Sequence, residues 1–338
     1  MEDKGSSSGD AVVVRHVTKT FERRERALAG EGVLRGLLHP HKSVLTALDD
    51  ISFRIAPGGF VAYAGPNGAG KSTTMKLLCG MLMPGSGDIR VLGLSPRRNR
   101  IRLMRRIGVL FGNRTELWWD HPVIQSFEWK RVVWDIPPEV YRENLAMVTE
   151  LLDLSGLLHT FTRELSLGQR MRADLALMLL HSPELVLLDE PTLGLDVVAK
   201  RQMIGFLKTL NREKGVTILV TSHDMDDLEE MAERVLMIAE GQIVYDGGFD
   251  GLRRVAGSLS RIALTMADGQ EPAIEGTRLL TARRGVYEFE VDLDRTPVRE
   301  LLGRVAQLEG VRDVELRKAP IEEVVAGLYT VWKNGGPD

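Results

Sequence analysis

Cysteine is nearly absent from this chain, and long apolar runs and an excess of positive charge are absent altogether. The 338 residues contain one cysteine, Cys79, which excludes a disulfide framework and favours a reducing compartment. No apolar stretch approaches the roughly 18 residues that would span a bilayer. The formal net charge of -3 lacks the excess of positive charge that is typical of nucleic-acid-binding proteins, so we expect no nucleic-acid partner. We therefore expect a soluble, cytoplasmic protein.

The length is sufficient for one large domain and one small domain. Residues 1–10 are polar and acidic, and we expect a disordered tail there rather than a signal peptide. Turn-forming residues at 247–251 indicate a boundary. We place the large domain at 11–250 and a small domain at 251–338.

The most informative stretch runs from Gly65 to Ser72 and fits the phosphate-binding pattern G-x-x-x-x-G-K-[ST]. The apolar residues 60–64 predict a buried strand before it, and residues 73–79 predict a helix after it. Glycines let backbone N–H groups turn toward phosphate oxygens, and the helix N-terminus adds partial positive charge. Lys71 would reach the β- and γ-phosphates, and the Ser72 hydroxyl would ligate Mg²⁺. The predicted nucleotide-binding residues here are Gly65, Pro66, Asn67, Gly68, Ala69, Gly70, Lys71, Ser72 and Thr73.

Two carboxylates follow the all-apolar run 185–188, which is typical of a buried parallel strand. Carboxylates at the C-terminal end of such a strand face the same crevice as the phosphate loop. Asp189 would hold Mg²⁺, and Glu190 would polarise an attacking water. The pattern predicts a nucleoside triphosphatase.

Three further motifs surround this pair in order: LSLGQR at 165–170, GLD at 194–196 and TSHD at 221–224. With the phosphate loop and the carboxylate strand, they make the chain resemble the ATP-binding-cassette (ABC) ATPases over about residues 12–250. The resemblance implies an α/β fold, a P-loop NTPase cassette with a mixed sheet core, an antiparallel β subdomain and a helical subdomain at about 113–181.

The resemblance also implies functional residues. Those that would contact ATP held by a second subunit are Ser166, Gly168 and Gln169. Asp196 would bridge the two sites, and His223 would contact the γ-phosphate of its own subunit. A turn histidine after the apolar strand 216–220 is the alternative interpretation of His223. The start of a helix at 165–166 suits an anion, because its N–H groups lack partners within the helix.

Two positions depart from the family pattern. Leu167 stands where the signature usually has glycine, which reduces backbone freedom but leaves Ser166 and Gly168 in place. The family's glutamine, which senses Mg²⁺ and the attacking water, is matched by Asn113 after the strand 107–111. Asparagine shortens the reach by about 1.5 Å. Either the loop lies closer to the metal or a water bridges the gap.

An aromatic residue at the end of the first strand stacks on adenine in this family. The strand 12–21 makes Phe21 the candidate, with the next strand near 47–55. An arginine-rich insertion, 22–44, separates the two strands. We interpret it as a solvated hairpin loop; binding to lipid headgroups or an acidic partner is the alternative.

Four tryptophans gather in the expected helical subdomain: Trp118, Trp119, Trp129 and Trp134. Helical patterns are expected at 123–134, 138–152 and 169–180. Tryptophan is enriched at binding hot spots, so Trp118 or Trp119 is expected to contact a membrane partner, while others form the subdomain's own core. The segment 111–120 looks like the corresponding loop in exporter-type ABC ATPases of the drug-resistance branch.

Beyond residue 250 no catalytic motif is present. Strands are expected at 259–265, 286–291 and 311–316, and helices at 298–308 and 321–329. The mixed order predicts a small α+β accessory domain, for which dimer contact and ligand sensing remain alternatives.

The resemblance implies an ATP- and Mg²⁺-dependent subunit that hydrolyses ATP to drive transport. Export is the expected direction. It would act as a homodimer or half of a heterodimer, bound peripherally at the cytoplasmic face of the membrane to separately encoded permease subunits. The alternatives are a soluble ABC ATPase that remodels ribosomes or DNA, and an importer subunit. Two cassettes or long coiled-coil arms would be typical of the first alternative, and this chain has neither.

Overall fold

The structure, a computed structural model, describes residues 9–24, 42–112, 114–222, 224–255, 259–267, 271–283, 285–293, 295–318 and 325. The chain divides into two compact units, Met1–Asp246 and Gly247–Asp338. Residues 1–8 of the predicted tail lie outside the described ranges.

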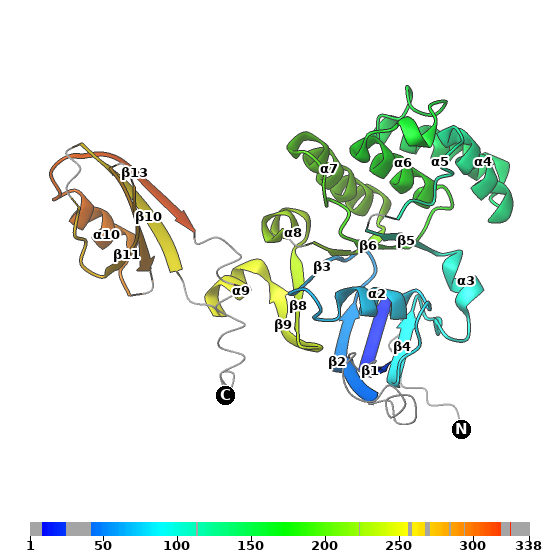
Figure 1. The fold of residues 1–338 in the computed structure, drawn as a ribbon, viewed down its shortest axis with the longest axis horizontal. Helices are drawn as coiled ribbons and strands as arrows, with labels where there is room; N and C mark the ends of the chain where they lie inside the picture. Colours follow the sequence, from blue (N-terminus) through cyan, green and yellow to red (C-terminus); the bar gives the residue numbers. More distant parts are fainter. Residues whose placement is uncertain are drawn as a thin grey trace, which may run out of the picture. The chain divides into compact units, whose positions relative to one another are not determined.

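A three-stranded antiparallel sheet begins the first unit (Figure 1). Its order is β2-β1-β4, from β1 (Val12–Arg24), β2 (Lys42–Ile55) and β4 (Ser86–Val91). The predicted strands 12–21 and 47–55 are confirmed, but their predicted ends are wrong. Glu22 pairs with Val44 and Arg24 pairs with Lys42, so backbone pairing continues past Phe21 into the predicted insertion. Residues 25–41 of that insertion lie outside the described ranges.

A six-stranded sheet forms the centre of the first unit, in the order β5-β6-β7-β3-β8-β9. Its strands are β3 (Phe60–Ala64), β5 (Ile107–Phe111), β6 (Leu185–Asp189), β7 (Thr217–Thr221), β8 (Arg234–Ala239) and β9 (Gln242–Gly248). The first five pair in parallel. Their near-continuous apolar sequences follow from burial on both faces. The strands predicted around the motifs are confirmed, with β7 shifted by one residue.

Helix α2 (Lys71–Leu78) packs within the core shared by the two sheets. Its Met75, Leu77 and Leu78 are buried with Ile51 of β2 and Leu187 of β6. Burial of these side chains anchors the helix directly behind the phosphate loop, because each fully buried large side chain contributes about 1.5–3 kcal/mol.

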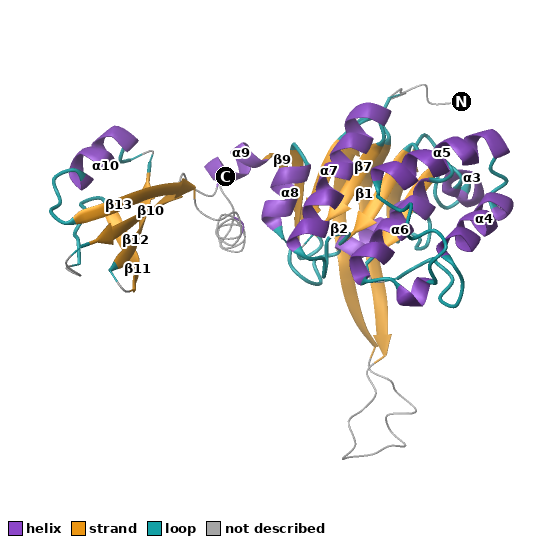
Figure 2. Ribbon diagram, turned by 90° about the horizontal axis from the view of Figure 1, so that it is seen from above, coloured by secondary structure: helices purple, strands orange, loops and turns teal. Residues whose placement is uncertain are grey.

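The remaining helices of the unit include a separate helical group. The elements are α3 (Arg100–Met104), α4 (Val123–Val133), α5 (Pro138–Leu151), the 3-10 turn η1 (Thr162–Glu164), α6 (Leu167–Leu179), α7 (Val197–Lys214) and α8 (Met225–Met231). Helices α4, α5 and α6 lie together in both views (Figures 1 and 2), which confirms the predicted helical subdomain. The fold is therefore the predicted cassette: a mixed α/β core, an antiparallel sheet and a helical group.

The second unit is a four-stranded antiparallel sheet in the order β11-β12-β10-β13. Its elements are α9 (Phe249–Val255), β10 (Leu259–Met266), β11 (Thr277–Arg283), β12 (Val286–Asp292), α10 (Val298–Val305) and β13 (Val311–Lys318). Ile262, Phe289 and Leu301 are among the buried residues that join sheet and helix. The predicted strands are confirmed; the helix predicted at 298–308 is present but ends at Val305, and β11 was not predicted. Of the predicted helix 321–329, the structure describes only Val325.

Candidate functional site

The phosphate loop connects β3 to α2, as predicted. A Cβ atom at Gly65 would lie 2.2 Å from the carbonyl oxygen of Ile238 in β8, so only glycine fits. Gly70 is the N-cap residue of α2 and has a φ of 115°, which side chains rarely allow. No side chain caps the first turn of α2. Its N–H groups and the helix dipole therefore provide an anion-binding surface at the loop.

Lys71 lies inside this loop. Its Nζ donates to the carbonyl oxygen of Gly65 at 2.6 Å and to that of Pro66 at 3.2 Å. Burial lowers the pKa of Lys71, while the carboxylates of Glu190 and Asp189 oppose that lowering. The structure thus places the ammonium of the phosphate loop within electrostatic reach of the acidic pair, although the two motifs are far apart in sequence.

The acidic pair is held at the C-terminal end of β6 by the neighbouring strands. Asp189 Oδ1 accepts a hydrogen bond from Thr221 Oγ1 at 2.7 Å. The Glu190 N–H donates to the carbonyl oxygen and Oγ1 of Thr221, both at 3.1 Å. From the other side, the Gly112 N–H donates to the Asp189 carbonyl oxygen at 2.8 Å.

Glu190 itself has a φ of 58°, in the left-handed region. Such a conformation costs about 1–3 kcal/mol in a residue other than glycine, and it persists because the surrounding bonds determine it. The neighbouring strands β5 and β7 thus fix the backbone positions of Asp189 and Glu190 at the end of β6.

The signature motif forms the predicted helix N-terminus. Ser166 is the N-cap of α6, and its Oγ accepts a hydrogen bond from the Gln169 N–H at 3.2 Å. The Gln169 side-chain oxygen accepts from the Ser166 N–H at 2.9 Å, completing a capping box. The side chain of Gln169 thus closes the helix end, while Ser166 is exposed.

The start of α6 packs against the segment that follows the acidic pair. A Cβ added at Gly194 would lie 2.9 Å from Leu167 Cδ2, and one added at Gly168 would lie 3.4 Å from Ala199 Cβ. Asp196 caps α7 by accepting a hydrogen bond from the Ala199 N–H at 2.8 Å. The structure therefore brings the predicted residues Ser166, Gly168 and Asp196 into one part of the unit.

Comparison with known proteins agrees with this arrangement. The sequence pattern of the ABC transporter family matches residues 48–193. A Clostridium acetobutylicum protein named as an ABC transporter ATP-binding protein is 32% identical over 204 residues, which cover 60% of this chain and 73% of that protein. This chain belongs to the ABC transporter ATP-binding family.

Other relatives of this family are matched over smaller shares of their length. An uncharacterized ABC transporter ATP-binding protein of Bacillus subtilis is 33% identical over 59% of this chain and 64% of its own length. The Escherichia coli "Probable multidrug ABC transporter ATP-binding protein YbhF" is 32% identical over 61% of this chain and 35% of its own length. The chain thus spans less than two thirds of the length of these two relatives.

Solved ABC cassettes share the fold. A dimeric cassette in a post-hydrolysis state, bound to ADP and Pi, superposes with a TM-score of 0.58 at 24% identity, covering 70% of this chain and 98% of that one. The cbiO1 subunit of a Clostridium perfringens ABC transporter complex superposes with a TM-score of 0.59 at 25% identity, covering 73% and 94%. The chain therefore shares the fold of the ABC cassettes.

Phe21, the predicted adenine-stacking residue, lies inside β1 and not at its end. It pairs with Leu45 of β2 and is half-buried, and the ammonium of Lys19 lies 5.0 Å from its ring centroid. Its contact with adenine stays a prediction. Asn113 and His223 lie outside the described residues.

A cluster beside the acidic pair escaped the sequence analysis. Lys200 Nζ in α7 lies 2.6 Å from Asp224 Oδ2 and 3.0 Å from Asp227 Oδ2. Asp227 also accepts a hydrogen bond from Thr192 Oγ1 at 3.0 Å. These bonds join α7, α8 and the segment after Glu190. The only local signal was the acid-rich start of α8, which by itself is an ordinary helix N-terminus.

A large cavity in the first unit lies away from this chemistry. It has a volume of about 750 Å³, and its lining includes Arg106, Glu184 and Thr217. Glu184 and Thr217 lie at the N-terminal ends of β6 and β7, whereas the phosphate loop and the acidic pair follow the C-terminal ends of β3 and β6. The cavity is therefore separate from the candidate site.

Proposed function

We propose that this chain is the ATP-hydrolysing subunit of an ABC transporter and that two subunits enclose ATP between them. One observation carries the proposal: Lys71 lies near Asp189 and Glu190, while Ser166 is exposed on a different helix. Helices α2 and α6 lie apart in Figure 1. This separation supports a site in which the phosphate loop of one chain and the signature of a second chain contact the same nucleotide.

Within each site, the phosphate loop Gly65–Thr73 would bind the phosphates, with Lys71 at the β- and γ-phosphates. Glu190 would act as general base on water, and His223 and Asn113 would contact the γ-phosphate and the metal. Ser72 and Asp189 would hold Mg²⁺, because a hydroxyl and a carboxylate completed by phosphate oxygens are the oxygen ligands that Mg²⁺ prefers. Phe21 would stack on adenine.

The second subunit would contribute Ser166, Gly168 and Gln169, with Asp196 between the sites. Exposed apolar side chains beside Asp196 support this dimer face: Leu193 is 44% exposed, Val197 66% and Val198 67%. Such a cluster on a monomer favours burial against a partner. A homodimer satisfies this with one chain, since the same face serves both copies.

Transport would require separate permease subunits. Among the described residues, no helix has both the length and the apolar character needed to cross a bilayer. Trp118 and Trp119 are 38% and 51% exposed on the helical group, and they would contact the permease at the cytoplasmic face of the membrane. Export as the direction is supported by the multidrug name of the Escherichia coli relative and by the loop at 111–120.

The Glu190→Gln variant tests the proposal. It should bind ATP and form an ATP-stabilised dimer, with hydrolysis reduced by at least about a hundredfold because the general base is lost. Glu184→Gln is the matched control: the same change six residues earlier, where Glu184 Oε2 pairs with Arg106 Nη2 at 2.7 Å. Dimers would be measured by analytical ultracentrifugation, and turnover by phosphate release.

Undiminished turnover in Glu190→Gln would exclude this residue as the base. Full turnover by a strictly monomeric chain, unaffected by Ser166→Ala, would overturn the two-subunit site. Cofractionation separates the rival function: recovery with a permease in membranes supports transport, whereas salt-sensitive recovery with ribosomes supports remodelling.

A further inference from the structure

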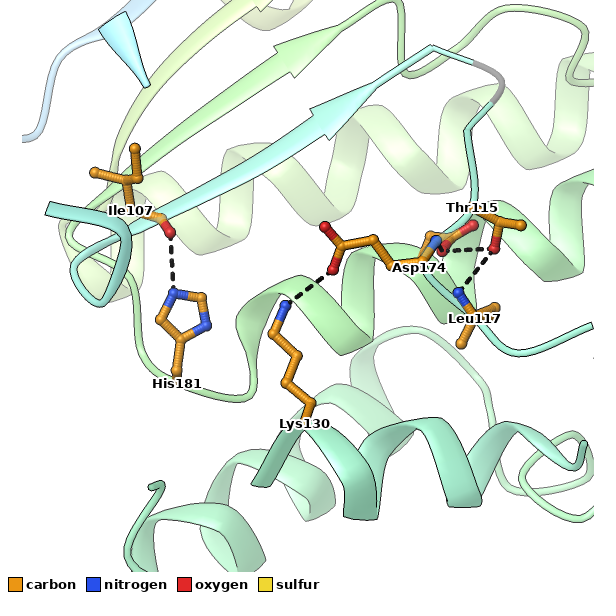
Figure 3. A network of polar contacts seen from close by, with 7 residues as sticks. Ile107, Thr115, Leu117, Lys130, Asp174 and His181 are labelled. Carbon is orange, nitrogen blue, oxygen red and sulfur yellow. Dashed lines mark hydrogen bonds and ion pairs between the residues drawn. The ribbon is translucent and has the colours of Figure 1, made fainter. Parts of the chain in front are cut away.

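A polar cluster that includes the buried side chains of Asp174 and Lys130 lies in the helical group (Figure 3). Its centre is Asp174 on α6, whose side chain is almost entirely buried. Asp174 Oδ1 accepts two hydrogen bonds from one short segment: from Thr115 Oγ1 at 2.9 Å and from the Glu116 N–H at 3.0 Å. An apolar residue at 174 would deprive both donors of this acceptor.

The same segment is also bound to α4. Lys130 Nζ lies 3.3 Å from Glu116 Oε2, and the Lys130 side chain is only 5% exposed. The Trp118 N–H donates to Ser126 Oγ at 2.9 Å. Within the segment, the Leu117 N–H donates to Thr115 Oγ1 at 3.1 Å. Residues 115–118 are therefore fastened at nearly every position to the helices beneath them.

Both ends of the segment meet functional parts of the molecule. Upstream, the Gly112 N–H donates to the carbonyl oxygen of Asp189 in the candidate site. Downstream, the Arg170 guanidinium lies 5.6 Å from the ring centroid of Trp119. Arg170 and Asp174 are four residues apart on α6 and so lie on one face of it. The signature helix thus holds the segment at two successive turns.

We propose that Asp174 is a positioning residue that makes the segment 114–119 and the signature helix α6 move as one body. When nucleotide contacts Ser166, the N-cap residue of α6, the resulting movement of the helix is then transmitted to Trp118 and Trp119. This inference rests on the proposed function, because it requires ATP at the signature. The buried carboxylate of Asp174 would thus connect the ATP held by one subunit to Trp118 and Trp119 of the other subunit.

The charges around Asp174 are consistent with a side chain that acts by holding its neighbours in place. Burial raises the pKa of Asp174 to about 6, against the hydrogen bonds from Thr115 and Glu116 that lower it. The Glu116 carboxylate raises it further, and Arg170 lowers it. Ionisation of Asp174 is therefore unfavourable in the folded chain. An uncharged acceptor of the same shape would keep both hydrogen bonds without this cost.

Hydrogen exchange of the full chain tests the link. In a Glu190→Gln background, Mg-ATP should slow amide exchange in the peptide 114–120 by about tenfold, because the signature helix becomes held by nucleotide. Adding Asp174→Ala should abolish this response, whereas Asp174→Asn should retain it, because its carbonyl oxygen still accepts both bonds. The strand peptide 286–292 of β12, in the second unit, is the internal reference, and ultracentrifugation reports ATP-driven dimers in each variant.

The outcomes separate the two proposals. If Asp174→Ala forms ATP dimers and its peptide 114–120 responds as in the parent, Asp174 is not the link, while the proposed function stands. If the parent forms no ATP dimer, both proposals are overturned. Should Asp174→Ala fail to fold, Thr115→Val decides, since it removes one of the two donors: a weakened response supports the link, and an unchanged response overturns it.

Discussion

Replacing Asp174 with asparagine tests what its buried negative charge costs the folded chain. Asparagine has the same shape and keeps an oxygen for Thr115 and Glu116, so the change removes the titrating charge and little else. The pKa of Asp174 rises from 3.8 in its ordinary environment to about 6 in the fold. The folded chain therefore binds a proton more readily than the unfolded chain, and the wild type loses stability as pH rises between these values.

The magnitude follows from the shift. Above about pH 6 the full penalty is present, and it amounts to about 3 kcal/mol at roughly 1.36 kcal/mol per pKa unit. Near pH 4.5 only about 1 kcal/mol of it remains, because the folded carboxyl is already protonated. The stability advantage of Asp174→Asn over the wild type should therefore grow by about 2 kcal/mol between pH 4.5 and pH 8.

His181 provides a control of opposite sign in the same helical group. Burial lowers its pKa to about 4, and the charge of Lys130 adds to this effect. Its Nε2 donates to the carbonyl oxygen of Ile107 at 3.0 Å. The folded chain resists protonation of this ring, so the wild type loses about 2.5 kcal/mol as pH falls from 8 to 4.5. His181→Gln keeps an N–H donor without titrating, so its advantage should grow toward acid.

Urea unfolding followed by tryptophan fluorescence is the assay. Four of the five tryptophans lie between residues 118 and 134, so the signal reports this helical group. An Asp174→Asn advantage that stays flat with pH would refute the burial argument. Equal slopes for the two variants would show that a general acid effect, and not these two groups, sets the response.

Three further predictions concern the candidate site. Gly65→Ala should weaken ATP binding by at least about tenfold in a nucleotide-binding assay, because its Cβ would meet the Ile238 carbonyl oxygen; wild-type affinity would contradict the close packing there. Thr221→Val removes the hydroxyl held by Asp189 and should lower kcat about tenfold at unchanged ATP affinity; an unaltered kcat would show that the carboxylate needs no such support. Ser166→Ala should cost about 1 kcal/mol in urea unfolding, and Ser166→Thr should recover most of it; no loss would show that the cap adds nothing to stability.

The central sheet and its motifs were predictable from sequence for a physical reason. Parallel strands buried on both faces are apolar runs, and the residues at their C-terminal ends must be glycine or polar to serve a ligand. The strands before Gly65 and Asp189 show both properties. The start of α6 was predictable too, because Ser166 and Gln169 have the spacing of a capping box.

Elements defined by distant pairing were not predictable. Residues 22–24 continue β1 only because residues 42–44 lie opposite them, and their polar sequence resembles a loop. β11 has no regular alternation of apolar residues, and its conformation follows from pairing with β12. Strand ends and edge strands depend on partners that local sequence does not contain.

The polar clusters were missed for the same reason. Asp174 and Thr115 are 59 residues apart, and neither lies in a motif. A lone acid inside an apolar helix face, as in α6, was the one signal available. The Lys200 cluster likewise joins two helices and a loop through contacts that appear only in the fold.

In the proposed two-subunit site, the capping box at Ser166 has a consequence for how fast the two copies would engage. In the folded chain, the Ser166 hydroxyl oxygen accepts a hydrogen bond from the Gln169 N–H, which restrains it. The hydroxyl proton remains available for donation to a ligand. An incoming phosphate thus meets a donor whose rotational freedom is already reduced, and little ordering entropy is lost on contact. Diffusional encounter of the two chains, rather than rearrangement of the helix end, should then limit the rate of closure.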